Sequence, residues 1–292
     1  MILYDFVRPD SLEQVSELLA SKPGKSKVIA GGTDLLVQLR NNDKKLQSLE
    51  LVIDLSALAS ELATVREEGD YLIIGALMTH NQVEQNELIQ REFRHLSKAS
   101  ASVGSPQIRK LGTLGGGVCN GSPASDVVPA LLSSDAEVLI FGKNGQRSQA
   151  LIDFAAMNGK GALADDEFVS GFKLRKLPAS AKTGFSKVGR RKALAISRLN
   201  AAVVLVLDEN NKISDARIAP GCIFRTPDRV TEAEQSLIGK EISQEAFAEA
   251  GEIVSKVMIE RTGYRWSTPY KEIAVKAVVT DALCDASGLE VF

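Results

Sequence analysis

The local structure of this sequence is indicated most clearly by IAGGTDLL at residues 29–36. The apolar residues of Lys27–Ala30 predict a short strand, which the doublet of Gly31 and Gly32 ends. Asp34 can cap the helix expected from the leucines that follow. Consecutive glycines let a ligand approach the backbone closely and leave several N–H groups pointing one way. Strand, glycine turn and helix together predict a binding place for a phosphate or pyrophosphate.

A second glycine-rich stretch, TLGGG at residues 113–117, leads into VCNGSPASD, which ends at Asp126. Neither stretch contains G-x-x-x-x-G-K-[ST], and the spacing from Gly115 to Asn120 only approaches G-x-G-x-x-G, which argues against a P-loop or Rossmann site. Each doublet alone is typical of a tight turn. Because both lie near hydroxyl residues and an aspartate, they favour one shared dinucleotide site. Asp34 and Asp126 either cap helices or contact that ligand.

The composition is that of an ordinary globular protein. The 292 residues include 35 basic and 37 acidic ones, a net charge of −2, which argues against a nucleic-acid partner. Apolar residues make up 44% and charged residues 25%, as in folded soluble domains rather than disordered chains. No apolar run reaches the ~18 residues of a membrane span, and the opening MILYDFVRPD lacks a secretory pattern, so we expect a cytoplasmic protein.

Cysteine and histidine are too scarce and too scattered to predict a metal centre or a hydrolytic triad. The cysteines are Cys119, Cys222 and Cys284, and the histidines are His80 and His95. Because CxxC, HExxH and G-x-S-x-G are all absent, we expect no metal ligand and no catalytic nucleophile, and both histidines should be ordinary core or surface residues. Redox or transfer chemistry would then depend on a bound cofactor.

The apolar patterns predict an α+β protein with two domains. The expected strands are residues 27–30, 51–54, 71–74, 136–141, 168–174, 184–188, 201–208 and 213–220. The expected helices lie around residues 12–19, 35–39, 79–83, 93–102, 127–132, 231–238, 245–258 and 268–286. The short polar segment 179–183 is typical of a linker, so we place the domain boundary there, between residues 1–178 and 184–292.

Five stretches are similar to those of a known family. They are AGGTD at 30–34, SVGSPQIRKLGTLGGGVCNGSPASD at 102–126, FSKVGRRKALAIS at 185–197, APGCIFRTPDRVTEAE at 219–234 and YKEIAVKAVV at 270–279. Over nearly its whole length the sequence resembles the FAD-binding medium subunit of molybdenum hydroxylases, a family that includes subunits of xanthine, carbon monoxide and nicotinate dehydrogenases. The nicotinate type is the most similar in SVGSPQIR and KALAIS.

This resemblance implies a fold, a cofactor and partners. Residues 1–178 would form a two-part FAD-binding domain of the vanillyl-alcohol-oxidase (PCMH) type. Residues 184–292 would form a CO dehydrogenase flavoprotein-like C-terminal domain with a three-stranded antiparallel sheet and helices. FAD would receive electrons from a molybdopterin-containing large subunit through a 2Fe-2S small subunit and pass them to NAD(P)+ or another acceptor. The chain would then be an electron-transfer subunit of an oxidoreductase, with no catalytic residue of its own.

The family's cofactor contacts carry over to named positions of this chain. The residues that would hold the FAD pyrophosphate are Ile29, Ala30, Gly31, Gly32, Thr33, Asp34, Leu35 and Leu36. Those that would form a turn at the second phosphate and the ribityl chain are Thr113, Leu114, Gly115, Gly116 and Gly117. Asp126 would bond the ribityl or adenosine part, and the residues that would line the flavin are Val103, Val169 and Lys187.

One compact basic group is open to two interpretations. It consists of Lys187, Arg190, Arg191 and Lys192. Such a group is either a solvated surface turn or a source of positive charge beside the flavin. In the second interpretation Lys187 stabilises negative charge on the reduced flavin and so raises its potential as an electron acceptor.

The sequence departs from the family in its second glycine stretch. The family usually reads Gly-Gly-Asn where this chain ends in Gly117, so one side-chain amide contact is missing and only backbone donors remain, a loss of about 1 kcal/mol for a typical hydrogen bond. The benzoyl-CoA reductase branch is disfavoured because its cysteine-rich insertion is absent. Two alternatives stay open: a cofactor-free assembly subunit, supported by Gly117, and a stand-alone FAD-dependent oxidase. The organic substrate and the final electron acceptor are not specified by this chain.

Overall fold

A computed structural model of the chain describes residues 3–157, 162–191 and 193–290. The chain divides into two compact units, each assembled from segments that are far apart in the sequence. Unit 1 comprises Met1–Gln82, Pro106–Gly121 and Glu137–Leu174. Unit 2 comprises Val83–Ser105, Ser122–Ala136 and Arg175–Phe292.

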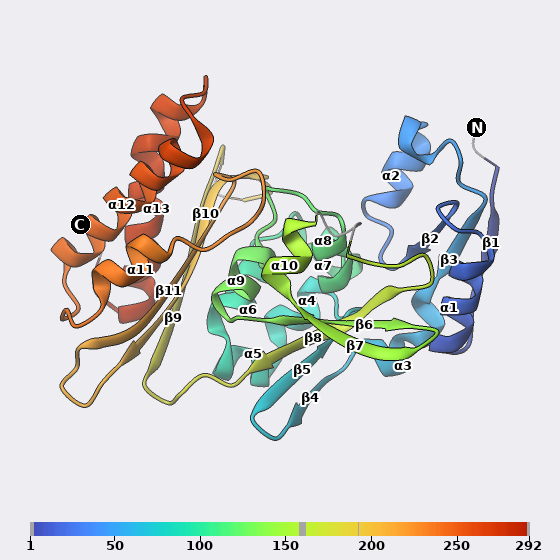
Figure 1. Ribbon diagram of the computed structural model, residues 1–292, viewed down its shortest axis with the longest axis horizontal. Coiled ribbons are helices and arrows are strands. Elements are labelled where there is room, and N and C mark those ends of the chain that lie inside the picture. Colours follow the sequence, from blue (N-terminus) through green and yellow to red (C-terminus); the bar gives the residue numbers. More distant parts are fainter. Residues whose placement is uncertain (1–2, 158–161, 192, 291–292) are drawn as a thin grey trace. The chain divides into compact units, whose positions relative to one another are not determined.

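Unit 1 begins with a three-stranded parallel sheet in the order β1-β3-β2, drawn in blue in Figure 1. Its elements are β1 (Asp5–Val7), α1 (Leu12–Ser21), β2 (Ser26–Ile29), α2 (Leu35–Arg40) and β3 (Leu51–Asp54). Leu51 and Ile53 pack with the apolar residues of α1, and Val52 packs with those of α2. All four residues of β3 are therefore buried, which explains why this strand is apolar at consecutive rather than alternate positions.

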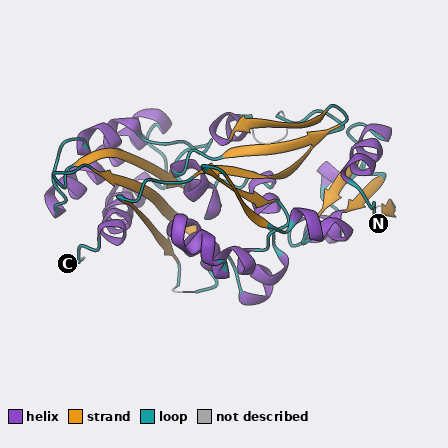
Figure 2. Ribbon diagram, turned by 90° about the horizontal axis from the view of Figure 1, so that it is seen from below, coloured by secondary structure: helices purple, strands orange, loops and turns teal. Residues whose placement is uncertain are grey.

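Unit 1 also contains a five-stranded sheet in the order β4-β5-β8-β6-β7, whose strands are labelled in Figure 1; Figure 2 shows the strands from another side. Its strands are β4 (Val65–Glu68), β5 (Tyr71–Gly75), β6 (Glu137–Gly142), β7 (Gly145–Ala150) and β8 (Phe168–Arg175). The hairpin of β6 and β7 closes between Gly142 and Gly145, where the sequence predicts a turn. Phe168, Phe172 and Leu174 lie on one face of β8 and are at most 1% exposed, so this face belongs to the core.

Short helices complete the part of unit 1 that carries the predicted site. They are η1 (Lys44–Leu46), η2 (Leu55–Leu58), α3 (Ala59–Leu62), α4 (His80–Gln85), α7 (Pro106–Leu111), α8 (Leu114–Cys119) and α10 (Leu151–Ala156). The second glycine stretch lies in α8, so the turn expected there is wrong. The reason is local: Thr113 Oγ1 accepts a hydrogen bond from the Gly116 N–H at 3.1 Å and caps a helix that glycine alone would not favour.

Unit 2 is built on an antiparallel sheet in the order β11-β10-β9. Its elements are α5 (Glu87–Glu92), α6 (Arg94–Ala101), α9 (Val127–Ser133), β9 (Ala181–Gly189), β10 (Ser197–Leu207), β11 (Ile213–Gly221), α11 (Thr231–Leu237), α12 (Gln244–Thr262) and α13 (Thr268–Ser287). The helices α11, α12 and α13 lie on one side of this sheet, and α6 and α9 lie on the other (Figure 1). Because both faces are covered, every residue of Leu199–Leu205 is buried.

One helix start in unit 2 differs from its prediction. The T-x-x-E pattern of Thr231 and Glu234 predicts a capping box, but α11 begins at Thr231 itself and its N-cap is Val230. Glu234 is 4% exposed, and its Oε1 accepts hydrogen bonds from the Ile218 N–H and from Arg229 Nε, both at 2.8 Å. A buried backbone donor and a guanidinium bind this carboxylate more strongly than the helix terminus can.

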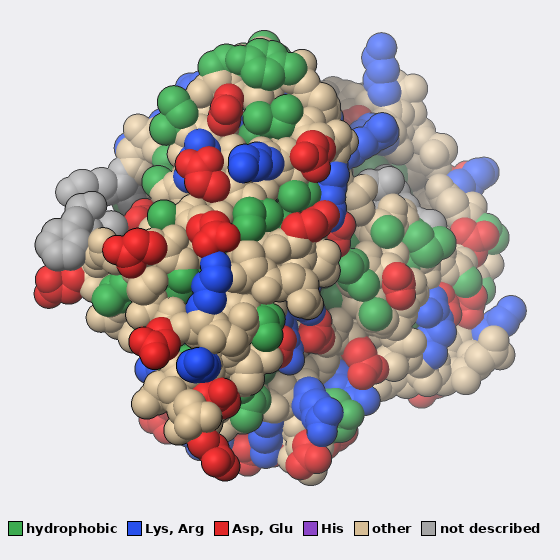
Figure 3. Space-filling view, turned by 60° about the vertical axis from the view of Figure 1, so that its left-hand side comes forward, with side chains coloured by type: hydrophobic (Ala, Val, Ile, Leu, Met, Phe, Trp, Pro, Cys, Tyr) green, Lys and Arg blue, Asp and Glu red, His purple; other side chains and the backbone are tan. Residues whose placement is uncertain are grey.

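Charged side chains of both signs are distributed over the surface. Acidic and basic side chains are mixed on the face drawn in Figure 3, consistent with the small net charge of −2. Among the described residues, none of the helices is both long enough and apolar enough to cross a membrane.

Candidate cofactor site

Unit 1 brings the first glycine stretch into contact with Leu111 and Gly112, which directly precede the second stretch. A Cβ at Gly31 would lie only 1.7 Å from the carbonyl oxygen of Leu111, so the two backbones touch where only glycine fits. A few residues away, Asn120 Nδ2 donates a hydrogen bond to Asp34 Oδ1 at 3.1 Å. Residues that are far apart in the sequence therefore share one surface, as a common dinucleotide site requires.

The first glycine stretch presents a row of free backbone donors. Within the described part of the chain, the N–H groups of Gly31, Gly32, Thr33 and Asp34 have no hydrogen-bond acceptor. Gly32 has a φ of +69°, a left-handed conformation that turns the chain between β2 and α2. These residues are partly or fully exposed. Such a concave run of N–H groups at a helix start is suited to bind a phosphate.

The second glycine stretch is built differently from our expectation. Four of its five N–H groups, those of Leu114 to Gly117, donate to Met78 O, Ala76 O, Thr113 Oγ1 and Thr113 O respectively, so these four are not the free backbone donors that the sequence suggested. Gly115 faces Ala76, where a Cβ would meet the Ala76 Cβ at 2.7 Å. Gly116 is exposed, and a Cβ there would meet only Thr113 Oγ1 at 3.0 Å. A ligand could therefore lie close to the backbone of this stretch, but it would receive no hydrogen bonds from the N–H groups of Leu114 to Gly117.

Apolar side chains surround the contact between Gly31 and Leu111. Leu36 and Val37 of α2 and Ile108 and Leu111 of α7 are between 38% and 57% exposed. Exposed apolar groups beside free N–H groups fit a ligand that has both a charged diphosphate and aromatic rings. The residues present in unit 1 therefore fit FAD.

Unit 2 brings three further predicted positions together around one ion pair. Lys187 Nζ donates to Asp126 Oδ2 at 2.6 Å and to the carbonyl oxygen of Ser102 at 2.9 Å, next to Val103. The Lys187 side chain is 15% exposed and that of Asp126 is 7% exposed. The solvated-turn interpretation is therefore wrong for Lys187, which lies on β9, whereas Arg190 and Arg191 are exposed. Lys192, the fourth member of the basic group, lies outside the described residues.

The two aspartates do not act as helix caps. Asp34 precedes α2 and Asp126 precedes α9, but among the described residues neither side chain makes a capping hydrogen bond. Asp34 accepts from Asn120, and Asp126 is held by partners on β9 and β10. The alternative of simple capping is thus excluded for both, while their contact with FAD stays a prediction. Val169 is 6% exposed within β8 of unit 1, and its predicted place beside the flavin is likewise untested.

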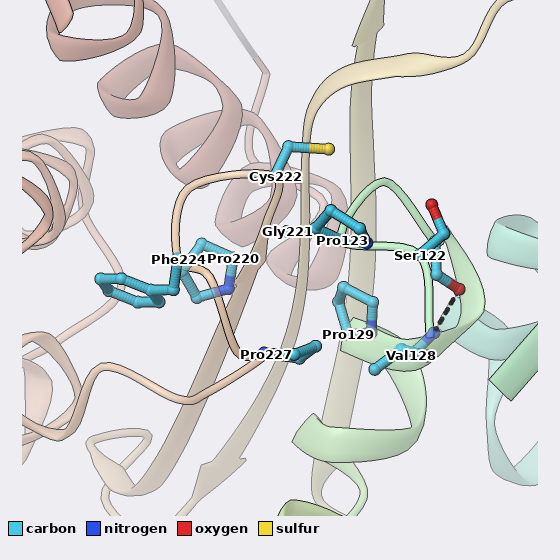
Figure 4. Close-up of a pocket in the computed structure, with 10 residues that line it drawn as sticks. Ser122, Pro123, Val128, Pro129, Pro220, Gly221, Cys222, Phe224 and Pro227 are labelled. Carbon is cyan, nitrogen blue, oxygen red and sulfur yellow. Dashed lines mark hydrogen bonds between the residues drawn. The ribbon is translucent and has the colours of Figure 1, made fainter. Parts of the chain in front are cut away.

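A small pocket in unit 2 is drawn in Figure 4. Its lining residues are Ser122, Pro123, Ser125, Val128, Pro129, Pro220, Gly221, Cys222, Phe224 and Pro227, and its empty volume is about 240 Å³, part of which is open to solvent. None of the residues that the sequence predicts to bind FAD lines this pocket, so we do not assign FAD to it. Burial, and next the carboxylate of Asp126, raise the pKa of the Cys222 thiol to about 11. At neutral pH this thiol is protonated and is a poor nucleophile.

The two histidines are core residues, in keeping with the sequence analysis. His80 is 4% exposed and His95 is fully buried. His95 Nε2 lies 3.1 Å from Ala130 O and 2.9 Å from Ser134 Oγ, and burial lowers the pKa of His95 to about 4. The described residues contain no group of three or more potential metal ligands.

Comparison with known proteins identifies the class of protein. Residues 3–175 match the family described as the FAD binding domain in molybdopterin dehydrogenase, and residues 185–286 match the CO dehydrogenase flavoprotein C-terminal domain. The nicotinate dehydrogenase FAD-subunit of Eubacterium barkeri is 33% identical over 97% of this chain and 95% of its own. The putative xanthine dehydrogenase FAD-binding subunit of Escherichia coli strain K12 is 29% identical over 98% of this chain and 99% of its own.

A solved structure confirms the fold. A chain of the carbon monoxide dehydrogenase from Hydrogenophaga pseudoflava superposes with a TM-score of 0.87 at 24% identity, covering 100% of both chains. The fold is thus that of an α+β flavoprotein, with the three-stranded antiparallel sheet and helices predicted for its C-terminal part. The chain belongs to the family of FAD-binding subunits of molybdopterin dehydrogenases, as the sequence analysis predicts. It is an FAD-binding medium subunit of an oxidoreductase.

Proposed function

We propose that this chain transfers electrons within a molybdenum hydroxylase. It would assemble with a molybdopterin-containing large subunit and a 2Fe-2S small subunit, and it would work in the cytoplasm. When bound, FAD supplies the chemistry that accepts electrons from those centres and delivers them to NAD(P)+ or another acceptor. Family membership and the names of the relatives support this proposal.

The observation that carries the proposal is the row of free N–H groups at Gly31–Asp34, beside Leu111 and Gly112, which directly precede the second glycine stretch. Residues Ile29–Leu36 would bind the pyrophosphate through these donors and through the dipole of the helix start. Thr113–Gly117 would let the cofactor lie close to the backbone at the exposed Gly116. The apolar side chains around the two stretches would exclude water from the ring systems.

The remaining predicted residues would orient the flavin. Val103, Asp126 and Lys187 are grouped in unit 2, and Val169 lies in unit 1. The two domains proposed from the sequence, 1–178 and 184–292, would supply the cofactor site and its support. The task of these residues would be to bind and orient the cofactor and to set its potential, while substrate hydroxylation would occur on the large subunit.

The test is reconstitution followed by capture from the native cell. The purified chain should take up one FAD, and a tagged chain should recover the large and 2Fe-2S subunits in the same complex. Reduction of the complex with its substrate, followed by NAD+, NADP+ and oxygen in turn, identifies the acceptor. A chain that takes up no FAD yet still recovers both partners supports the assembly-subunit alternative. A chain that oxidises a substrate with no partner present supports the stand-alone oxidase.

A further inference from the structure

The carboxylate of Asp126 is held by residues that the predicted cofactor contacts do not include. Asp126 Oδ1 accepts hydrogen bonds from Ser197 Oγ at 2.5 Å and from Asn200 Nδ2 at 2.9 Å. Its other oxygen, Oδ2, accepts from Lys187 Nζ at 2.6 Å. Ser197 is 6% exposed and Asn200 is 1% exposed, so water competes little for these bonds. Both oxygens of the carboxylate are thus fixed in direction.

Lys187 depends on this carboxylate for its own position. Its other hydrogen bond is to the carbonyl oxygen of Ser102, at the end of α6 and next to Val103. Lys187 is therefore bonded both to Asp126 and to the residue that precedes Val103. The ammonium and the carboxylate are 2.6 Å apart, so their charges nearly cancel at a distance. The electrostatic effect of the pair on a nearby group therefore depends on how the pair is oriented.

Asn200 is held in one orientation by its surroundings. Its Nδ2 donates to Ser125 O at 3.1 Å as well as to Asp126, whereas its buried Oδ1 has no hydrogen-bond partner among the described residues. That oxygen faces Gly221, where a Cβ would lie 2.0 Å from it. A buried acceptor without a hydrogen bond lowers the stability of the fold, so other interactions of the same residue must offset this loss. The two hydrogen bonds that Asn200 Nδ2 donates provide the offset.

We propose that Ser197 and Asn200 are positioning residues for the cofactor. They hold the carboxylate of Asp126 in one orientation, and through it they hold Lys187 against the carbonyl oxygen of Ser102, next to Val103. This inference rests on the proposed placement of FAD against these residues. Its consequence is that loosening β10 at these two side chains releases Lys187, although neither side chain need touch the cofactor.

The test compares FAD binding in variants of the full chain. In Asn200→Ala the carboxylate loses one charge-assisted hydrogen bond, and we expect FAD to bind about tenfold more weakly. The ratio of affinities for reduced and oxidised FAD, read as the midpoint potential, should shift as well. Ser197→Ala should act in the same direction, and Ser197→Thr, which keeps the hydroxyl, should restore both quantities. Ser197→Ala also serves as the second variant if Asn200→Ala does not fold.

A control in the same unit separates positioning from folding. Ser134→Ala removes a buried hydroxyl that bonds His95 and does not touch the Asp126 cluster. It should lower the melting temperature of the cofactor-free chain without changing FAD affinity or potential. If Asn200→Ala and Ser197→Ala behave as this control does, the cluster is structural only and the inference is overturned. If the unmodified chain itself takes up no FAD, the proposed function fails, and this inference fails with it.

Discussion

Replacing Gly32 by alanine tests whether the free N–H groups bind the cofactor, and Gly24 provides a matched control. Both glycines have a φ of +69°, so alanine is equally strained at each and should cost about 1–2 kcal/mol of folding stability. At Gly24 no described atom lies within 4 Å of an added Cβ, and at Gly32 the nearest atom is the flexible Leu36 Cδ1 at 3.0 Å. The two variants should therefore lose similar stability.

Only the Gly32 variant should lose cofactor. In Gly32→Ala the backbone relieves its strain by rotating the peptide at this position. The N–H groups of Gly32 and Thr33 then no longer point toward the phosphate. Losing one or two bonds to a charged phosphate costs about 1.5–3 kcal/mol, so FAD should bind about 10- to 100-fold more weakly. Urea denaturation measures the stability of both variants, and a titration of flavin fluorescence measures binding. Equal FAD affinity in Gly32→Ala and Gly24→Ala would refute the assignment of the pyrophosphate to this stretch.

Three further outcomes are expected. Gly116→Ala should raise helix stability by up to about 1 kcal/mol yet weaken FAD binding, because its methyl group occupies the exposed approach to α8; tighter or unchanged binding in the titration counts against that approach. His95 has its pKa lowered to about 4 from an ordinary 6.5, so the unfolded chain takes up a proton first as the pH falls. Stability should therefore drop by about 3 kcal/mol between pH 6.5 and pH 4, and urea denaturation of His95→Gln should show a smaller drop. Arg229→Met leaves the buried Glu234 carboxylate without its cation and should cost about 3 kcal/mol; a loss well below 1 kcal/mol would show that this ion pair does not support unit 2.

Local sequence patterns were sufficient to predict the positions of strand segments whose residues are apolar. The strand β3 was predicted at its observed bounds, and the apolar part of β10 from Ala201 to Leu207 was predicted closely, whereas its start at Ser197–Asn200, which contains polar residues, was missed. The strands β4 and β7 were missed because their sequences, VREE and GQRSQA, are charged or polar and mostly exposed at the edges of a sheet. An edge strand needs only backbone partners, so it leaves little hydrophobic pattern to read.

The sequence predicted which stretches form the site but not what each stretch contributes to it. Two glycine doublets indicated one shared site, and the contact of Gly31 with Leu111 brings them together. The sequence does not show that the N–H groups of the first stretch are free whereas most of those of the second donate hydrogen bonds within the protein. Two of the acceptors, Met78 and Ala76, come from a segment that is distant in the sequence. In the same way, Ser197 and Asn200 look like ordinary strand residues until the fold places them against Asp126.

The discontinuous make-up of unit 2 limits how the protein can be dissected. The side of its sheet that α6 and α9 cover is supplied by chain that precedes residue 137, inside the region matched by the first family. A fragment starting at residue 184 would lack both helices and would expose alternate apolar residues of β10, among them Ala202 and Val204. Such a fragment should self-associate rather than fold. Fragment studies or reporter insertions should therefore leave residues 83–136 in the same polypeptide as the C-terminal sheet.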